Sequence, residues 1–239
     1  MDYFFNRFIF TVIFSGFTAI LALGQNAELL VADSLFSNQK YTEAFEKYEN
    51  IFQDNQASPA MLTRMAFIQE GLGNYTDALY YLNLYYLKTS DKASLAKMRE
   101  IAEEHNLVGY EYSDVRFFEN YTRKYQVEIT LLLLAFSAFL LFYSYRKFKK
   151  EEKPVTATIL QVVTLIVILI TNNNLVTKES AIVRQDQAII MSGPSAGSEP
   201  IDYVGKGNKV TVKESDDLWT QIEWQGAEAY IRNKNIRKL

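Results

Sequence analysis

The chain has 239 residues, a formal net charge of −3 and no cysteine. The lack of cysteine excludes disulfides, thiol catalysis, thiolate metal sites and a lipidated amino-terminal cysteine. The charge shows no basic excess of the kind that attracts polyanions, so nucleic acid is not an expected partner. The length leaves room for small domains in addition to membrane-spanning segments.

The first 25 residues have the pattern of an export signal. Arg7 precedes an apolar run over residues 8–23, and Ala22 and Gly24 place small residues at the positions that a signal peptidase requires. We therefore expect residues 1–25 to be a cleaved signal peptide; the alternative is an uncleaved N-terminal anchor. Both outcomes carry the chain from residue 26 onward out of the cytoplasm.

Residues 26–110 repeat themselves with a period of 34 residues. Tyr41-Thr-Glu-Ala44 recurs as Tyr75-Thr-Asp-Ala78, and Ala32 matches Ala66. This resembles the tetratricopeptide repeat, a helix-turn-helix unit of that length. The resemblance implies an all-α repeat domain whose concave surface binds peptides or partner proteins.

By the same resemblance, the binding groove is lined by the first helix of each repeat. The groove residues that it implies are Leu29, Asp33, Phe36, Thr63, Phe67 and Glu70. Leu29 and Asp33 stand where some family members carry the Lys and Asn that clamp an acidic C-terminus, so an acidic tail is not the expected ligand. The helical segment at residues 92–105 can cap the stack. A tyrosine cluster is interpreted as packing between helices or, alternatively, as an aromatic contact surface: Tyr80, Tyr81, Tyr85 and Tyr86.

Two apolar runs follow a predicted helical linker at residues 111–126. Residues 129–145 contain 17 residues without a charge, and residues 154–177 contain 24. A helix needs about 20 apolar residues to cross the hydrocarbon core of a bilayer. We predict transmembrane helices at residues 127–145 and 155–171; a buried hairpin of a soluble domain is the alternative, but such helices carry a polar face.

The connector at residues 146–154 determines the expected orientation of the hairpin. It holds five basic residues: Arg146, Lys147, Lys149, Lys150 and Lys153. Because basic loops stay in the cytoplasm, this loop is predicted to be cytoplasmic, with both flanking domains outside. The lipid bilayer is therefore the first expected partner.

Residues 172–239 change to the period-2 pattern of a small β domain. Five short strands are predicted, at residues 181–183, 188–191, 209–213, 218–224 and 227–231. Their number and spacing indicate a small barrel. The segments that resemble a bacterial SH3-like domain are Ser192-Gly-Pro-Ser195, Gly207-Asn-Lys-Val210, Asp217-Leu-Trp219 and Ala229-Tyr-Ile231.

This resemblance implies a ligand surface, because some relatives bind cell-wall peptides while others are only spacers. Trp219 and Tyr230 are the candidate aromatic shelf, Tyr230 standing where the family usually has Trp. The alternative is that both rings are ordinary packing of the barrel.

Residues that could perform chemistry are sparse. His105 is the single histidine, so neither a catalytic triad nor a histidine metal set can form around it. The glycines form no phosphate-binding loop followed by Lys-Ser or Lys-Thr. We therefore expect a protein that is not an enzyme and has no catalytic residue, cofactor or metal.

The order of modules (export signal, tetratricopeptide-type repeats, membrane hairpin, SH3-like domain) resembles the E-type proteins of the Bacteroides aerotolerance operons. Their operon neighbours include a MoxR-type ATPase and von Willebrand A-domain membrane proteins. The resemblance implies a scaffold in the inner membrane of a Gram-negative bacterium, with both domains in the periplasm. The alternative is a cell-envelope sensor or anchor whose SH3-like domain binds peptidoglycan or a peptide.

Overall fold

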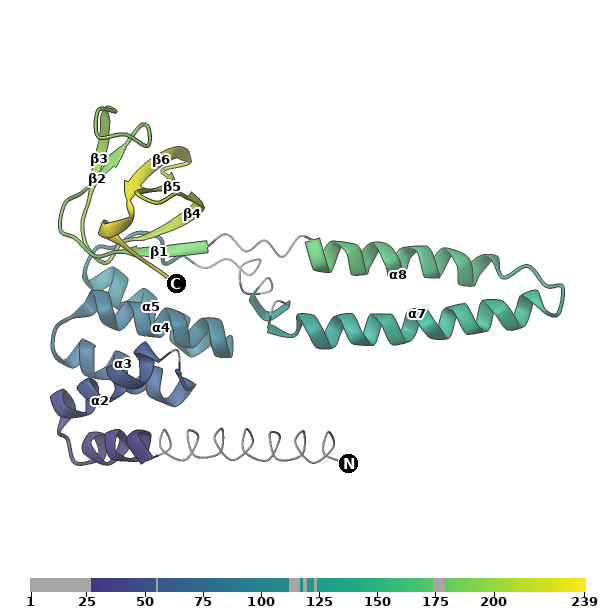
Figure 1. The fold of residues 1–239 in the computed structure, drawn as a ribbon, viewed down its shortest axis with the longest axis horizontal. Coiled ribbons are helices and arrows are strands. Elements are labelled where there is room, and N and C mark those ends of the chain that lie inside the picture. Colours follow the sequence, from purple (N-terminus) through teal and green to yellow (C-terminus); the bar gives the residue numbers. More distant parts are fainter. Residues whose placement is uncertain (1–26, 55, 112–116, 118–119, 123, 174–178) are drawn as a thin grey trace, which may run out of the picture. The chain divides into compact units, whose positions relative to one another are not determined.

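The computed structural model of the protein describes residues 27–54, 56–111, 117, 120–122, 124–173 and 179–239 (Figure 1). The chain forms two compact units, Met1–Tyr85 and Tyr86–Leu239. The predicted signal at residues 1–25 and part of the predicted linker at residues 111–126 lie outside the described residues.

The first unit is helical in its described part. A helix at residues 27–37 is followed by α2 (Tyr41–Gln53), α3 (Pro59–Gly71) and α4 (Tyr75–Thr89), which continues into the second unit. Pro59 begins α3 at a position where its missing N–H is not needed, and Ser58 caps the helix by accepting from the Met61 N–H at 3.1 Å.

Two turns of this unit, before α2 and before α4, have the same geometry at a spacing of 34 residues. The second residue after each helix is left-handed, with φ of 61° at Gln39 and 77° at Gly73. Both turns make the same two backbone hydrogen bonds: Gln39 N–H to Phe36 O and Lys40 N–H to Leu35 O in the first, Gly73 N–H to Glu70 O and Asn74 N–H to Gln69 O in the second. This is the Schellman arrangement, so the sequence period is also a period of the backbone.

Small residues at the same period allow the helices to approach closely. Ala32, Ala44 and Ala78 are fully buried and Ala66 is 3% exposed. Larger buried side chains fill the space around them: Tyr48, Met61, Leu62, Met65, Ile68, Leu79 and Tyr81. Interiors of this kind are packed at crystal-like density, so each of these side chains is sensitive to truncation.

The second unit contains α5 (Lys92–Glu104) and the two long apolar helices α7 (Gln126–Phe148) and α8 (Val155–Asn173). Asp91 caps α5 by accepting from the Ala93 N–H at 3.0 Å. Figure 1 shows α7 and α8 side by side, and they are in contact. Most apolar side chains of the pair are exposed, for example Leu132 at 73%.

The side chains that are buried where α7 meets α8 are mostly small or polar, and Leu140 is the large apolar one among them. Ser137, Ala157 and Thr164 are buried there, and the Gln161 side-chain amide donates to Ser137 Oγ at 2.7 Å. The 18-residue windows of the two helices have mean hydropathies of 2.0 and 2.1. Both helices are therefore long and apolar enough to cross a membrane. α7 also takes in Gln126 and residues 146–148, beyond the predicted span.

The C-terminal part of the second unit is one antiparallel sheet. Its strands are β1 (Glu179–Val183), β2 (Ala188–Met191), β3 (Pro200–Val204), β4 (Lys209–Ser215), β5 (Trp219–Trp224), β6 (Ala227–Arg232) and, after the 3₁₀ turn η1 (Asn233–Asn235), β7 (Ile236–Lys238). The order in the sheet is β3-β2-β6-β5-β4-β1-β7. The expectation of five strands was wrong, because β3 and β7 are additional strands.

The core of the sheet comes from residues that alternate along the strands, as period 2 requires. Buried members are Ala181, Val183, Ala188, Ile190, Val204, Val210, Val212, Ile222, Ala229, Ile231 and Ile236. The structure thus confirms the coarse prediction of a helical region with two apolar helices, followed by a β domain.

Candidate functional site

The groove residues implied by the helical repeat lie on two helices of the first unit. Leu29, Asp33 and Phe36 are on the helix at residues 27–37, and Thr63, Phe67 and Glu70 are on α3. Thr63 donates its hydroxyl to the Ala60 carbonyl at 2.8 Å, a contact within its own helix. Leu29 is half-buried and Glu70 is exposed.

Phe36 and Phe67 meet, and Tyr41 joins them to form an aromatic trio. The ring centroids are 5.8 Å apart for Phe36 and Phe67, 5.5 Å for Phe36 and Tyr41, and 5.7 Å for Tyr41 and Phe67. All three pairs are edge-to-face, the favourable geometry for aromatic side chains. Phe67 is 54% exposed, so the aromatic trio presents a large apolar ring on the surface.

A charged network adjoins the aromatic trio. Asp33 forms an ion pair with Arg64 and accepts the Tyr48 hydroxyl at 2.6 Å. The Arg64 guanidinium lies 5.6 Å from the centre of the Phe36 ring, a cation–π distance. Asp33 is therefore engaged by residues of its own unit, and it holds Arg64 against the aromatic trio.

This network shifts the ionisation of two of its members. Burial, followed by the hydrogen bond to Asp33, raises the pKa of the Tyr48 hydroxyl well above its ordinary value of 10.0. The hydrogen bond to Asp33 also raises the pKa of Arg64. Both groups stay protonated at neutral pH, so the Arg64 charge beside the aromatic trio is permanent. Arg64, Tyr41 and Tyr48 were missed in the sequence, because no local spacing links them to the groove positions.

Tyr80 and Tyr81 of the tyrosine cluster pack within the first unit, which agrees with the first of the two interpretations. Tyr80 is 8% and Tyr81 is 1% exposed. The Tyr81 ring packs edge-to-face against Phe45 and Phe52, and its hydroxyl donates to Glu49 Oε2 at 2.6 Å.

Trp219 and Tyr230 lie on the same outer face of the sheet. Trp219 is paired with Arg232 across strands β5 and β6, and Tyr230 is paired with Gln221. Because side chains alternate along a strand, these four residues project from one face, opposite the buried Thr220, Ile222 and Ile231. The Arg232 guanidinium lies 5.2 Å from the Trp219 ring. Both rings are half-buried on this face and the Arg232 charge lies beside Trp219, and their role as a ligand shelf stays a prediction.

A hollow beside β4 was not expected from the sequence. It has a volume of about 470 Å³ and is lined by Val108, Gly109, Glu111, Ser180, Lys209, Thr211 and residues 223–226. Trp224, in its wall, is held by a hydrogen bond from its indole N–H to Asp202 Oδ2 at 2.9 Å. The hollow includes residues from the segment after α5, which lies far from the sheet in the sequence.

A comparison with known families fits this architecture. Residues 181–237 match the bacterial SH3 domain. The match covers the sheet from β1 to β7, and it confirms the predicted bacterial SH3 domain. No curated protein matches the chain.

The tip between α7 and α8 carries the predicted basic residues. Arg146 and Lys147 lie in the last turn of α7, and Lys149, Lys150 and Lys153 follow in the connection. Lys147 pairs with Glu152 at 3.4 Å and lies 5.7 Å from the Tyr143 ring, while Lys149 lies 5.2 Å from the Tyr145 ring.

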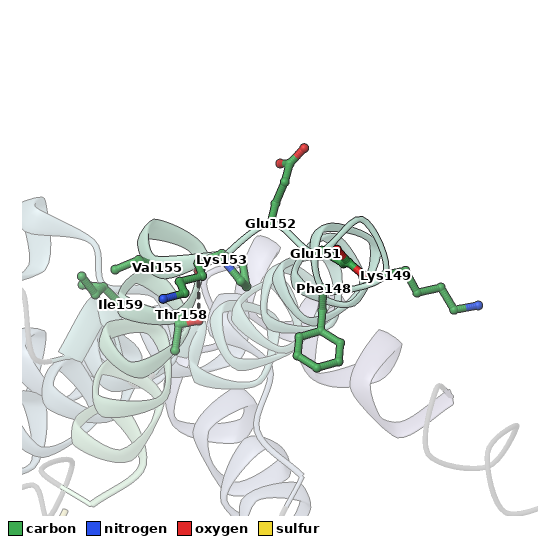
Figure 2. A pocket seen from close by; sticks show the side chains of 9 residues that line it. Phe148, Lys149, Glu151, Glu152, Lys153, Val155, Thr158 and Ile159 are labelled. Carbon is green, nitrogen blue, oxygen red and sulfur yellow. Dashed lines mark hydrogen bonds between the residues drawn. The ribbon is translucent and has the colours of Figure 1, made fainter.

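A hollow of about 840 Å³ lies at this tip, but its side chains do not converge. Figure 2 shows Glu152, Lys149 and Phe148 pointing in different directions. The arrangement is not that of a site that encloses a ligand, which needs converging polar groups. Among the described residues, no group of three or more His, Asp or Glu side chains could hold a metal ion.

Proposed function

We propose that the protein is a non-enzymatic membrane scaffold that binds a partner protein through its helical unit. The aromatic trio carries this proposal. An exposed Phe67 ring, supported by two further rings and a permanent Arg64 charge, has the composition of an interaction hot spot, in which aromatic residues and Arg are enriched. Because Asp33 already pairs with Arg64, the partner expected at this surface offers mainly an apolar side chain to the Phe67 ring.

The helical unit is, in this proposal, a tetratricopeptide-type array. The repeated Schellman turns and the buried alanines at the same 34-residue spacing support it. The face that carries Phe36 and Phe67 corresponds to the first helices of the two repeats, which line the concave surface in such arrays.

The proposed setting is the inner membrane, with α7 and α8 as a transmembrane hairpin and both domains in the periplasm. Five basic residues at the tip support a cytoplasmic connection. Contacts between residues 108–110 and 207–209 also support it, because they require the two flanks of the hairpin to be on the same side.

The order of modules supports a place in an assembly of the aerotolerance type, with a MoxR-type ATPase and von Willebrand A-domain membrane proteins. In that setting the helical unit would hold a von Willebrand A-domain or other partner close to the membrane, in support of stress or oxygen tolerance. No catalytic role is assigned to any residue.

A crosslinking experiment in intact cells tests the scaffold. A photoreactive amino acid at position 67 should crosslink to a defined protein, and the double variant Phe36→Ala with Tyr41→Ala should reduce that crosslink. Leu30→Ala, a truncation of a 68% exposed residue on the same helix as Phe36, is the matched control and should leave the crosslink intact. An equal loss in both variants, or no specific crosslink at position 67, would contradict the groove assignment.

Cysteine labelling tests the topology, because the natural chain has no cysteine. Single cysteines at the exposed positions Glu103, Lys150 and Lys234 are treated with an impermeant maleimide. We expect labelling from the periplasm at positions 103 and 234, and labelling at 150 only after the inner membrane is opened. Labelling of position 150 in cells with an intact inner membrane would reject this orientation.

A second candidate function is supported by Trp219, Tyr230 and Arg232. An aromatic face with one positive charge can bind a peptide or peptidoglycan, and the protein would then be an envelope sensor or anchor. The test is co-sedimentation of the full detergent-solubilised chain with purified cell wall. Trp219→Ala should abolish the co-sedimentation, whereas Leu218→Ala, at a neighbouring residue that is 72% exposed, should not. Absence of co-sedimentation would remove this candidate.

A further inference from the structure

A short segment after α5 contacts the bacterial SH3 domain. We name residues 107–110 the strap. The Leu107 N–H closes the end of α5 by donating to the Ala102 carbonyl at 2.8 Å, with Asn106 left-handed at φ 53°. The chain leaves the helix at this point, and the next residues run onto the turn between β3 and β4.

Val108 is held by its backbone on both sides. Its N–H donates to Asn208 Oδ1 at 2.8 Å, and its carbonyl accepts the Lys209 N–H at 3.0 Å. The Asn208 side chain is oriented for this by its own donation to the Gly205 carbonyl at 2.9 Å. One of these two bonds joins main chain to main chain and the other ends on a side chain, so Val108 is fixed at the start of β4, a strand inside the sheet.

Tyr110 anchors the strap. It is 3% exposed, although the strap lies outside the residues that match the bacterial SH3 family. Its hydroxyl donates to the Gly207 carbonyl at 2.7 Å, and the Lys209 ammonium lies 5.9 Å from its ring. A buried carbonyl that loses its donor destabilises the structure, so the Tyr110 contact stabilises the docked state.

Gly109 makes the close approach possible. Its φ of +91° favours glycine, and a Cβ at this position would lie 2.1 Å from the Lys209 carbonyl oxygen. A backbone oxygen cannot move aside as a flexible side chain can. Any other residue at position 109 must therefore displace the strap from β4.

We propose that the strap is an integral part of the bacterial SH3 domain, and that the face formed by Gly207, Asn208 and Lys209 is its docking surface. The domain is thus completed by residues about 100 positions upstream of its own turn, with the α7–α8 hairpin inserted between the two parts. Because only three residues separate Glu104, the last residue of α5, from Val108, the docked strap also holds the end of α5 close to the SH3 domain.

Docking of the strap also completes the hollow beside β4. Val108, Gly109 and Glu111 form one wall of this space, and Thr211 and Trp224 belong to the sheet. A molecule bound in the hollow would favour the docked strap, and undocking would remove part of its site, because two events that share one contact surface are thermodynamically linked. The strap therefore couples the α5 end of the helical region to a surface of the SH3 domain.

Hydrogen exchange of the full chain in detergent micelles tests the proposal. In Gly109→Ala, the peptide that contains the Lys209 amide should exchange about tenfold faster or more, because this amide is protected by the strap. Gly73→Ala is the matched control: Gly73 also has a positive φ, but nothing lies within 4 Å of its Cβ position. It should leave the Lys209 peptide unchanged.

Tyr110→Phe provides a second, milder variant that keeps the ring and removes only the hydroxyl. We expect a smaller acceleration of the same peptide. Faster exchange that spreads to the β5 peptide would mean that the SH3 domain needs the strap to fold, which also supports the proposal. Unchanged exchange of the Lys209 peptide in both variants, or equal acceleration in Gly73→Ala, would overturn it.

Discussion

Helices α3 and α7 are both rich in apolar residues, yet they use those residues in opposite ways. α3 buries six of its 13 residues inside the helical unit. α7 has 23 residues and buries only Ser137 and Leu140. In α3 the large apolar side chains Leu62, Met65 and Ile68 are buried by the rest of the unit. In α7 most large apolar side chains are exposed.

This difference is the one expected between a helix in water and a helix in a membrane, and it supports the proposed hairpin. Water drives large apolar side chains into the protein interior, so a soluble interface is made of them. Lipid is as apolar as leucine and provides no such drive, so helices in a membrane pair through small residues and hydrogen bonds. Ala157, Thr164 and the Gln161–Ser137 bond match the second pattern.

The largest expected effect is at the core of the helical unit. Leu62→Ala should lower the free energy of unfolding of this unit by about 2–5 kcal/mol, because Leu62 is fully buried and truncation leaves a cavity. Leu132→Ala, at a residue that is 73% exposed on α7, should leave it within about 0.5 kcal/mol. Both changes in unfolding free energy are measured by urea titration of the detergent-solubilised chain, with hydrogen exchange of the α3 peptide as the readout. Equal effects would mean that the two helices share one kind of environment.

The next effect concerns insertion of α7 into a membrane. Leu134→Arg places a charge near the middle of the apolar stretch, and an Arg at the centre of a membrane helix costs about 2.5–3.5 kcal/mol on insertion scales. The fraction of the chain that resists alkaline extraction from membranes should fall. Leu30→Arg, at an exposed position of the helical unit, should leave it unchanged. Retention of Leu134→Arg at the wild-type level would argue against a bilayer around α7.

Sequence patterns predicted most elements of the fold, and they missed the strands β3 and β7. The 34-residue period, the two uncharged runs and the alternation of β4 to β6 are visible along the sequence, and they predict the helical region, the two apolar helices and the strands that the structure has. β3 was missed because its pattern is inverted: Ile201 and Tyr203 are exposed at 52% and 62%, and only Val204 is buried. β7 has three residues, too few for any period to be visible.

The candidate sites were less accessible to sequence reasoning, because their contacts join distant positions. Asp33 and Arg64 are 31 residues apart and come together only through the packing of two helices. Val108 and Asn208 are 100 residues apart, with two apolar helices between them. Phe36 and Phe67 could be named in advance, since the repeat places both on first helices, but their support by Tyr41 and Arg64 could not.

The next effect is a pH-dependent change in stability at the hydrogen bond between Tyr48 and Asp33 in the helical unit. The pKa of Tyr48 is raised above its ordinary value of 10.0, so its stabilising contribution is fully present below about pH 10 and is lost as the pH rises further. Tyr48→Phe should lose a hydrogen bond worth about 1 kcal/mol at pH 8. The gap in unfolding free energy between wild type and Tyr48→Phe should narrow at pH 11, since the Tyr48 hydroxyl is the one titrating group that the variant lacks. A gap that stays constant would show that Tyr48 is not protonated preferentially in the folded state.

The smallest effect is at the polar contact between α7 and α8. Gln161→Leu removes the hydrogen bond to Ser137, and such bonds between membrane helices contribute about 0.6 kcal/mol on average. A double-mutant cycle with Ser137→Ala, measured by unfolding of the hairpin in mixed micelles, isolates this coupling from the change in packing. We expect a coupling well below the cost of Leu62→Ala, because the unpaired groups can find other partners in the unfolded hairpin. A coupling of several kcal/mol would instead place Gln161 in a dry protein interior, and the hairpin would then resemble the core of the helical unit.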